Sequence, residues 1–227
     1  MNKIKGFFSF YGLVYAQVAA STIVVALMEL VFNRLNLVST TSWQFYVLHL
    51  VILLPCLLVL TPAGYVSDKH PKERVLLWST VLSLPVSALF MGAAFLGNLP
   101  LAFVSAGLFF TLQAFFFPAK NGYMKELMGV RYLSKGSGIL MIVTFVSMMV
   151  SAACVALAFD KLVPPSLDFE SLVQALWPIA VSVPVLEFIG ILFAWRLPAI
   201  GAYDEDLKFP WDRYFNFVFA RRKFYKS

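Results

Sequence analysis

The feature that most constrains the fold is a succession of six long apolar runs joined by short polar connections. About 20 apolar residues in a helix cross a bilayer, and backbone groups in hydrocarbon must be satisfied within the protein. We therefore predict an all-α membrane protein, with a six-transmembrane-helix bundle over residues 1–200. The predicted spans are about 7–32, 44–66, 75–96, 101–122, 138–160 and 174–195.

Composition supports a chain built for lipid. Apolar residues make up 60% of the sequence, charged residues only 13%, and the mean hydropathy is +0.80. Soluble proteins carry about 25% charged residues. Phe-rich runs also form buried helices of soluble proteins, but six in succession favour the membrane. The first run is itself a full span, so we expect it to be retained rather than cleaved as a signal peptide.

The cations predict the orientation in the membrane. If the N-terminus is cytoplasmic, the inner segments hold 16 of the 18 Lys and Arg residues, and the outer segments hold only Arg34 and Lys161. Such a bias toward one side is typical of cytoplasmic loops. Both termini are therefore predicted to be cytoplasmic. The net charge of +6 does not indicate nucleic-acid binding, because the cations are scattered through loops rather than gathered on one face.

Residues 201–227 form a tail of different composition. An acidic patch, Asp204–Asp206, precedes a stretch in which aromatic residues alternate with cations. This pattern fits a short helix in the inner headgroup layer, and a flexible linker end is the alternative.

The connection between the second and third spans has a distinctive spacing. It places Gly64, Asp68, Lys69, Lys72 and Arg74 in the pattern G-x-x-x-D-K-x-x-K-x-R. We expect the glycine to end the second helix and to allow close helix approach. The cations are expected to pair with the aspartate and with carbonyls at the helix C-terminus. The pattern resembles the loop between the second and third helices of major facilitator superfamily transporters, where it helps to close the inner side.

Further segments resemble one family of that superfamily, the bacterial lysophospholipid transporters. The likeness extends over about residues 60–140. The segments are Gly64-x-Val66-x-Asp68-x-x-x-Lys72-x-Arg74-Val75, Phe117-Pro118-Ala119-Lys120-x-Gly122 with Glu126-Leu127 downstream, and Leu133-x-Lys135-x-x-Gly138. The resemblance implies a protein of the bacterial inner membrane that moves lysophospholipids inward. It implies the N-terminal six-helix half of such a transporter.

Two positions depart from that family. Val24 and Val25 stand where the family has an Asp-Asn pair in the first helix, and Met141 or a neighbour stands where it has a glutamate in the fifth. Polar groups inside membranes usually mark substrate or ion routes. Their replacement suggests that part of a coupling or headgroup site is lost.

Four residues are candidates for a substrate or proton site. Glu187 lies deep in the sixth span and is expected to face the bundle interior, either as a proton or headgroup site or as a structural hydrogen bond. Gln17 and Ser21 share one helical face, where they line a cavity or join helices. Lys120 binds a phosphate or serves as an ordinary inner anchor. Glu29 is close enough to the outer end of its helix to reach the interface.

No catalytic signature is evident. The sequence has no Walker loop, zinc-ligand spacing or nucleophile–base pair, and Cys56 and Cys154 fall inside apolar runs. We expect neither an enzyme nor a bound metal or cofactor.

Two functions remain open. The first is a half-transporter that requires a second six-helix half or a second copy, because alternating access moves one half against another. The second is a non-transporting subunit that uses a degenerate facilitator bundle as a scaffold. The expected partners are membrane lipids together with a second half, a second copy or other membrane subunits, and not nucleic acid.

Overall fold

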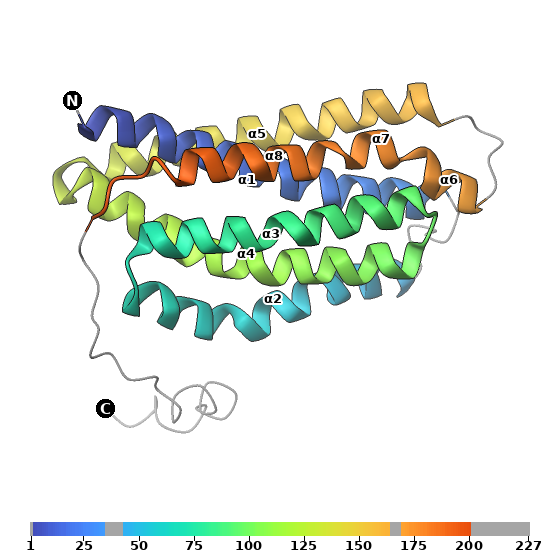
Figure 1. Ribbon diagram of the computed structural model, residues 1–227, viewed down its shortest axis with the longest axis horizontal. Helices are drawn as coiled ribbons and strands as arrows, with labels where there is room; N and C mark the ends of the chain where they lie inside the picture. Colours follow the sequence, from blue (N-terminus) through green and yellow to red (C-terminus); the bar gives the residue numbers. More distant parts are fainter. Residues whose placement is uncertain (1, 35–42, 164–168, 201–227) are drawn as a thin grey trace.

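The computed structural model describes residues 2–34, 43–163 and 169–200, and within these residues all regular structure is helical (Figure 1). The predicted tail, 201–227, lies outside the described residues. The helices are α1 (Asn2–Arg34), α2 (Trp43–Lys69), α3 (Lys72–Phe95), α4 (Leu99–Met128), α5 (Leu133–Leu162), α6 (Phe169–Ala175), α7 (Trp177–Ala180) and α8 (Ser182–Ala194), with a 3-10 turn at Val130–Tyr132.

Five stretches of the described chain are long and apolar enough to cross a membrane, which indicates a multi-pass membrane protein. They are Gly6–Val31, Lys72–Phe95, Leu99–Met128, Leu133–Leu162 and Trp177–Ala194. The remaining predicted span, 44–66, falls within the 27-residue helix α2. An all-helical fold is thus confirmed for the described residues, while the count of six spans stays a prediction.

The connection between α4 and α5 is much shorter than the apolar pattern suggests. We predict spans that end near residue 122 and restart near 138, but α4 continues to Met128 and α5 begins at Leu133. The basic residues between the predicted spans are therefore mostly helical. Gly129 ends α4 with a φ of 69°, a left-handed conformation that glycine adopts without a Cβ clash.

The turn between α2 and α3 also differs from the expectation. Helix α2 passes through Gly64 and Asp68 and ends at Lys69, so the prediction that Gly64 ends the helix is wrong. Only His70 and Pro71 separate the two helices. The residue before a proline is disfavoured in the helical conformation, which explains why the chain turns here.

The last predicted span, 174–195, is not one continuous helix. It is interrupted at Leu176 and Val181, between α6, α7 and α8. Pro178 and Pro184 lie in the first turns of α7 and α8. Proline has no backbone N–H and cannot donate to the carbonyl four residues earlier, so each proline accounts for one interruption.

Successive spans run in opposite directions. The start of α1, the α2–α3 turn, the α4–α5 turn and the end of α8 lie together at one end of the bundle, on the left in Figure 1. We call this the basic end. Helix α1 packs against α5 and α8, α4 packs against α2 and α3, and α3 also packs against α8. The side chains that define the basic end are Lys69, Arg74, Lys125, Arg131, Lys135 and Arg196.

Two apolar clusters form the core. One lies toward the basic end and includes Phe10, Leu76 and Phe116, and the other lies toward the opposite end and includes Leu27 and Phe90. Between the two clusters, buried polar side chains lie on α1, α3, α4, α5 and α8. These side chains form a layer, which we call the polar layer: Gln17, Thr80, Ser83, Gln113, Ser147 and Glu187.

Close packing of α1 on α8 at Gly12 predicts sensitivity to a single added methyl group. A Cβ on Gly12 would lie 2.9 Å from the ring of Phe193, whereas a Cβ on Gly92 would have no neighbour within 4 Å. We expect Gly12→Ala to destabilise the fold by about 1–3 kcal/mol, the usual cost of overpacking. Thermal unfolding in detergent is the measurement, with Gly92→Ala as the matched control. Equal melting temperatures for the two variants would contradict this packing.

Candidate functional site

The polar layer lies far from both ends of the bundle. Gln17, Gln113 and Ser147 are each near the midpoint of a helix of 30 or more residues, about 20 Å from either helix end at about 1.5 Å per residue. Only 1% of Gln17, 2% of Gln113 and none of Glu187 is exposed. Polar groups at this depth in a membrane are costly unless they are hydrogen-bonded to one another.

Three of these side chains form a hydrogen-bonded chain across α4, α1 and α8. Gln113 Nε2 donates to Gln17 Oε1 over 2.6 Å, and Gln17 Nε2 donates to Glu187 Oε2 over 2.7 Å. While Glu187 is ionised it only accepts hydrogen bonds, and this fixes which way each amide points. Gln17 must turn its amino group toward Glu187, and its oxygen then faces Gln113.

Glu187 has unused hydrogen-bonding capacity. Its second oxygen, Oε1, is buried and has no hydrogen-bond partner among the described residues. Buried polar atoms without partners are uncommon in proteins, and they often mark functional sites or bound water. Glu187 is therefore the member of the chain with room for one further partner or a proton.

The backbone of α8 makes space for this arrangement at Gly190, one turn after Glu187. A Cβ at Gly190 would lie 3.1 Å from Gln17 Nε2 and 3.3 Å from Thr80 Cγ2. The missing side chain lets the amide of Gln17 lie between α8 and α3. On the other side of α1, Ser147 Oγ donates to the carbonyl of Tyr15 over 2.8 Å, which joins α5 to the same layer.

A cavity of about 340 Å³ lies beside these hydrogen-bonded side chains, between α1, α4 and α5. Gln17 and Gln113 line it, while Glu187 is not a lining residue and lies behind Gln17. Ser21 also lines the cavity, and its Oγ donates to the carbonyl of Gln17 over 2.8 Å. The other walls combine apolar side chains with a few polar ones: Val18, Thr22, Val25, Ala26, Glu29, Phe110, Phe116, Phe117, Thr144, Met148 and Ala152.

The structure thus brings together three of the four predicted candidates, Gln17, Ser21 and Glu187. Lys120 lies about two turns further along α4 from Gln113, roughly 10 Å toward the basic end. It is buried, its ammonium group lies 5.1 Å from the ring centre of Phe117, and it does not line the cavity.

The predicted gating-loop residues do not pair as expected. Asp68 is exposed, and no ion pair to it forms within the described chain. Lys69 instead donates to the hydroxyl of Tyr65 over 3.1 Å. The expected close approach at Gly64 is also wrong, because a Cβ there would meet nothing within 4 Å.

Lys72 has a different partner from the one expected. It forms an ion pair with Glu126 and so links α3 to the last turns of α4. A Cβ on Gly122 would lie 2.6 Å from Cε of Lys72, so the absence of a side chain at Gly122 leaves room for the lysine side chain. Glycine at this position is explained by the ion pair rather than by helix–helix contact.

Sequence reasoning missed two residues of this site. Gln113 is a lone amide inside the Phe-rich segment of α4. Glu187 is a candidate because it is a polar residue deep inside an apolar span, and Gln113 meets the same criterion. Glu29 was expected to reach the interface, but it lines the cavity. For an acidic residue near a helix end, the sequence alone does not show whether its side chain reaches the membrane interface or lines a cavity.

The two departures from the facilitator pattern have different locations. Val25 lines the cavity, and Val24 is fully buried in the core beside it. Met141 is 62% exposed on α5 and does not line the cavity. Of these three positions, only Val25 lies in the cavity wall.

Comparison of the chain with protein-family models, curated proteins and solved structures finds no match. The described residues also hold no group of three or more His, Cys, Asp or Glu side chains that is suited to a metal ion.

Removal of Gln113 tests the hydrogen-bonded chain. We expect Gln113→Leu to destabilise the bundle by about 1–2 kcal/mol, because Gln17 loses its donor inside the membrane. The measurement is unfolding in mixed detergent micelles. Gln174→Leu, at an exposed position of α6, is the matched control and should change stability by less than about 0.5 kcal/mol. Equal losses of stability in the two variants would argue against the hydrogen bonds that join Gln113, Gln17 and Glu187.

Proposed function

We propose that this chain is one half of a major facilitator-type transporter for an amphipathic lipid, with a lysophospholipid as the substrate class. The cavity between α1, α4 and α5, with Gln17 and Gln113 in its wall, is the observation on which the proposal depends. It combines a mostly apolar wall with a few hydrogen-bonding groups, as expected for a ligand with an acyl chain and a polar part.

The packing of the helices supports a facilitator-like bundle. Facilitator halves contain two three-helix repeats with inverted topology. If α1 is exchanged with α4, α2 with α5 and α3 with α8, the main packing pairs are unchanged. The contacts of α1 with α5 and α8 become those of α4 with α2 and α3, and the α3–α8 contact maps onto itself.

In this proposal the polar layer provides the site that changes state during transport. Gln17 lines the cavity and at the same time donates to Glu187, so a headgroup that binds Gln17 competes with that hydrogen bond. Glu187 then gains or loses a donor as substrate enters or leaves. A proton on Glu187 is the simplest compensation for that change.

The proposal requires a second six-helix unit, because alternating access moves one half against another around a midplane site. That unit is a second copy or another chain. We place the protein in the bacterial inner membrane, with the basic end cytoplasmic, in accordance with the positive-inside rule.

A second function is favoured by one observation. Val25 occupies the cavity wall where the resemblance implies a polar residue, so the site has fewer groups for a headgroup or a coupling ion. A non-transporting subunit that uses the bundle as a scaffold would tolerate this loss. Mild detergent extraction would then yield a stable complex with other membrane subunits, and a monodisperse monomer would speak against the scaffold.

Two adjacent alanines of α5 give a matched test of transport. Both side chains are exposed, but Ala152 lines the cavity and Ala153 does not. We expect Ala152→Phe to reduce uptake of a labelled lysophospholipid at least about tenfold in membrane vesicles from the native cell, because the ring takes up space that the acyl chain needs. Ala153→Phe should leave uptake near the wild-type rate.

Glu187→Gln adds a test of the buried carboxyl group. It preserves size and hydrogen bonding but cannot exchange a proton, so we expect uptake to become independent of a pH gradient or to stop. Uptake that Ala152→Phe and Glu187→Gln leave unchanged would refute the transport site. Absence of uptake in the wild-type vesicles would favour the scaffold.

A further inference from the structure

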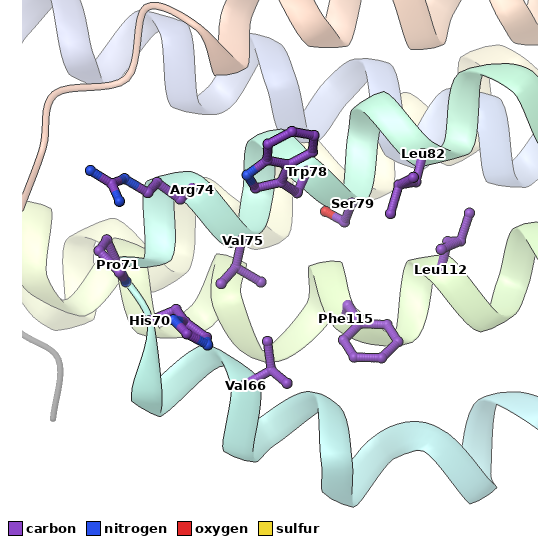
Figure 2. Close-up of a pocket in the computed structure, with 10 residues that line it drawn as sticks. All are labelled: Val66, His70, Pro71, Arg74, Val75, Trp78, Ser79, Leu82, Leu112 and Phe115. Carbon is purple, nitrogen blue, oxygen red and sulfur yellow. The ribbon is translucent and has the colours of Figure 1, made fainter. Parts of the chain in front are cut away.

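A second hollow lies on a different side of α4 and shares no lining residue with the first cavity. Helices α2 and α3 both pack against α4 but make little contact with each other, which leaves a groove of about 420 Å³ between them. Figure 2 shows Phe115 of α4 between side chains from α2 and α3, with Leu112 further along the groove beside Leu82. Its volume lies in the range of ligand sites, about 300–1,000 Å³.

The groove changes character along its length. At the basic end it is lined by His70, Pro71 and Arg74 (Figure 2). Toward the middle of the bundle the lining becomes apolar, with Leu82 and Leu112. A groove that is cationic at the membrane edge and apolar at depth matches an amphiphile with an anionic headgroup.

The charge at the mouth of the groove is available to a ligand. Arg74 is exposed and has no carboxylate partner within the described residues. Neighbouring Lys72 differs, because its ammonium group is held by Glu126 on α4. The acidic residues of this turn, Asp68 and Glu73, are not among the residues that line the groove.

The backbone adds to the positive potential. Pro71 is the N-cap of the 24-residue helix α3 and contributes no side-chain hydrogen bond to the first turn. The positive end of the α3 dipole faces the same mouth, and Glu73 in the first turn of α3 offsets part of its potential.

Trp78 marks the depth of the groove in the membrane. It is 61% exposed and lines the groove one turn after Arg74. Exposed tryptophans concentrate at the headgroup level of membrane proteins. The cationic mouth is thus at headgroup level, and the apolar part lies within the hydrocarbon.

We propose that this groove is a binding site for one anionic phospholipid of the leaflet at the basic end. The phosphate lies at Arg74 and His70, and one acyl chain follows the apolar wall toward Leu112. The site is independent of the transported substrate, since it lies outside the cavity that contains Gln17 and Gln113. A membrane lipid suits the groove better than a partner helix, because the cationic and apolar parts follow each other along one narrow hollow.

Native mass spectrometry of the detergent-solubilised full chain tests this site, with phosphatidylglycerol and phosphatidylcholine as probes. We expect wild-type protein to retain phosphatidylglycerol preferentially. Arg74→Gln should weaken that binding about tenfold, the value of one charge-assisted hydrogen bond. Arg131→Gln removes an exposed arginine at the same end outside the groove and should have no effect.

A groove-filling variant and a fluorescence measurement separate lipid binding from a loss of folding. Leu112→Trp should abolish binding of both lipids at an unchanged melting temperature. If that variant is unstable, quenching of Trp78 by brominated phosphatidylglycerol, measured as the difference from Trp78→Phe, should be strong in wild-type protein and weak in Arg74→Gln. Equal binding of the two lipids, or equal effects of Arg74→Gln and Arg131→Gln, would overturn the proposal. Capture of a protein at Trp78 by crosslinking, without lipid, would also overturn it.

Discussion

The hydrogen bond between Gln17 and Glu187 is the constraint on which much of the structure depends. It buries a carboxyl group near the middle of a helical bundle, where an unpaired polar group is expensive. Helix α8 lies close against α1 at this level, and a Cβ on Gly190 would come within 3.1 Å of Gln17 Nε2. Gln113 then holds the amide of Gln17 from the far side, which sets the position of α4 relative to α1. Three helices are thereby fixed in register at one level.

The same interaction connects the bundle's core to its cavity. Gln17 belongs to both, since it lines the hollow between α1, α4 and α5 and also donates to the buried carboxyl group. A ligand that binds Gln17 from the cavity therefore changes the hydrogen bonding of Glu187 without touching it. In the proposed transporter, close packing on one side and a hollow on the other would let this residue pair respond to a bound lipid. The groove at Arg74 shares no lining residue with this cavity.

Hydropathy alone predicts the helical nature of the chain, because spans are specified locally by their apolar length. Helix ends were harder to predict. Charged residues near Lys125 and Lys135 extend the helices beyond their apolar parts, and prolines at 178 and 184 interrupt the last span. Glu187 and Gln17 stood out singly as polar residues in apolar runs, but their pairing depends on how α1 packs against α8. The predicted ion pairs of Asp68 failed for a similar reason, because Lys72 finds Glu126 on a helix distant in sequence.

The most direct test of the polar layer is a double-mutant cycle between Gln17 and Glu187. It uses Gln17→Leu, Glu187→Leu and the double variant, with unfolding free energies measured in mixed micelles. The structure predicts that the double variant loses less stability than the sum of the single variants. The expected coupling is about 0.6 kcal/mol, with about 1.7 kcal/mol as the upper limit, which are the average and the maximum for interhelical hydrogen bonds in such cycles. Additive effects, with a coupling below about 0.3 kcal/mol, would contradict a hydrogen bond between these two side chains.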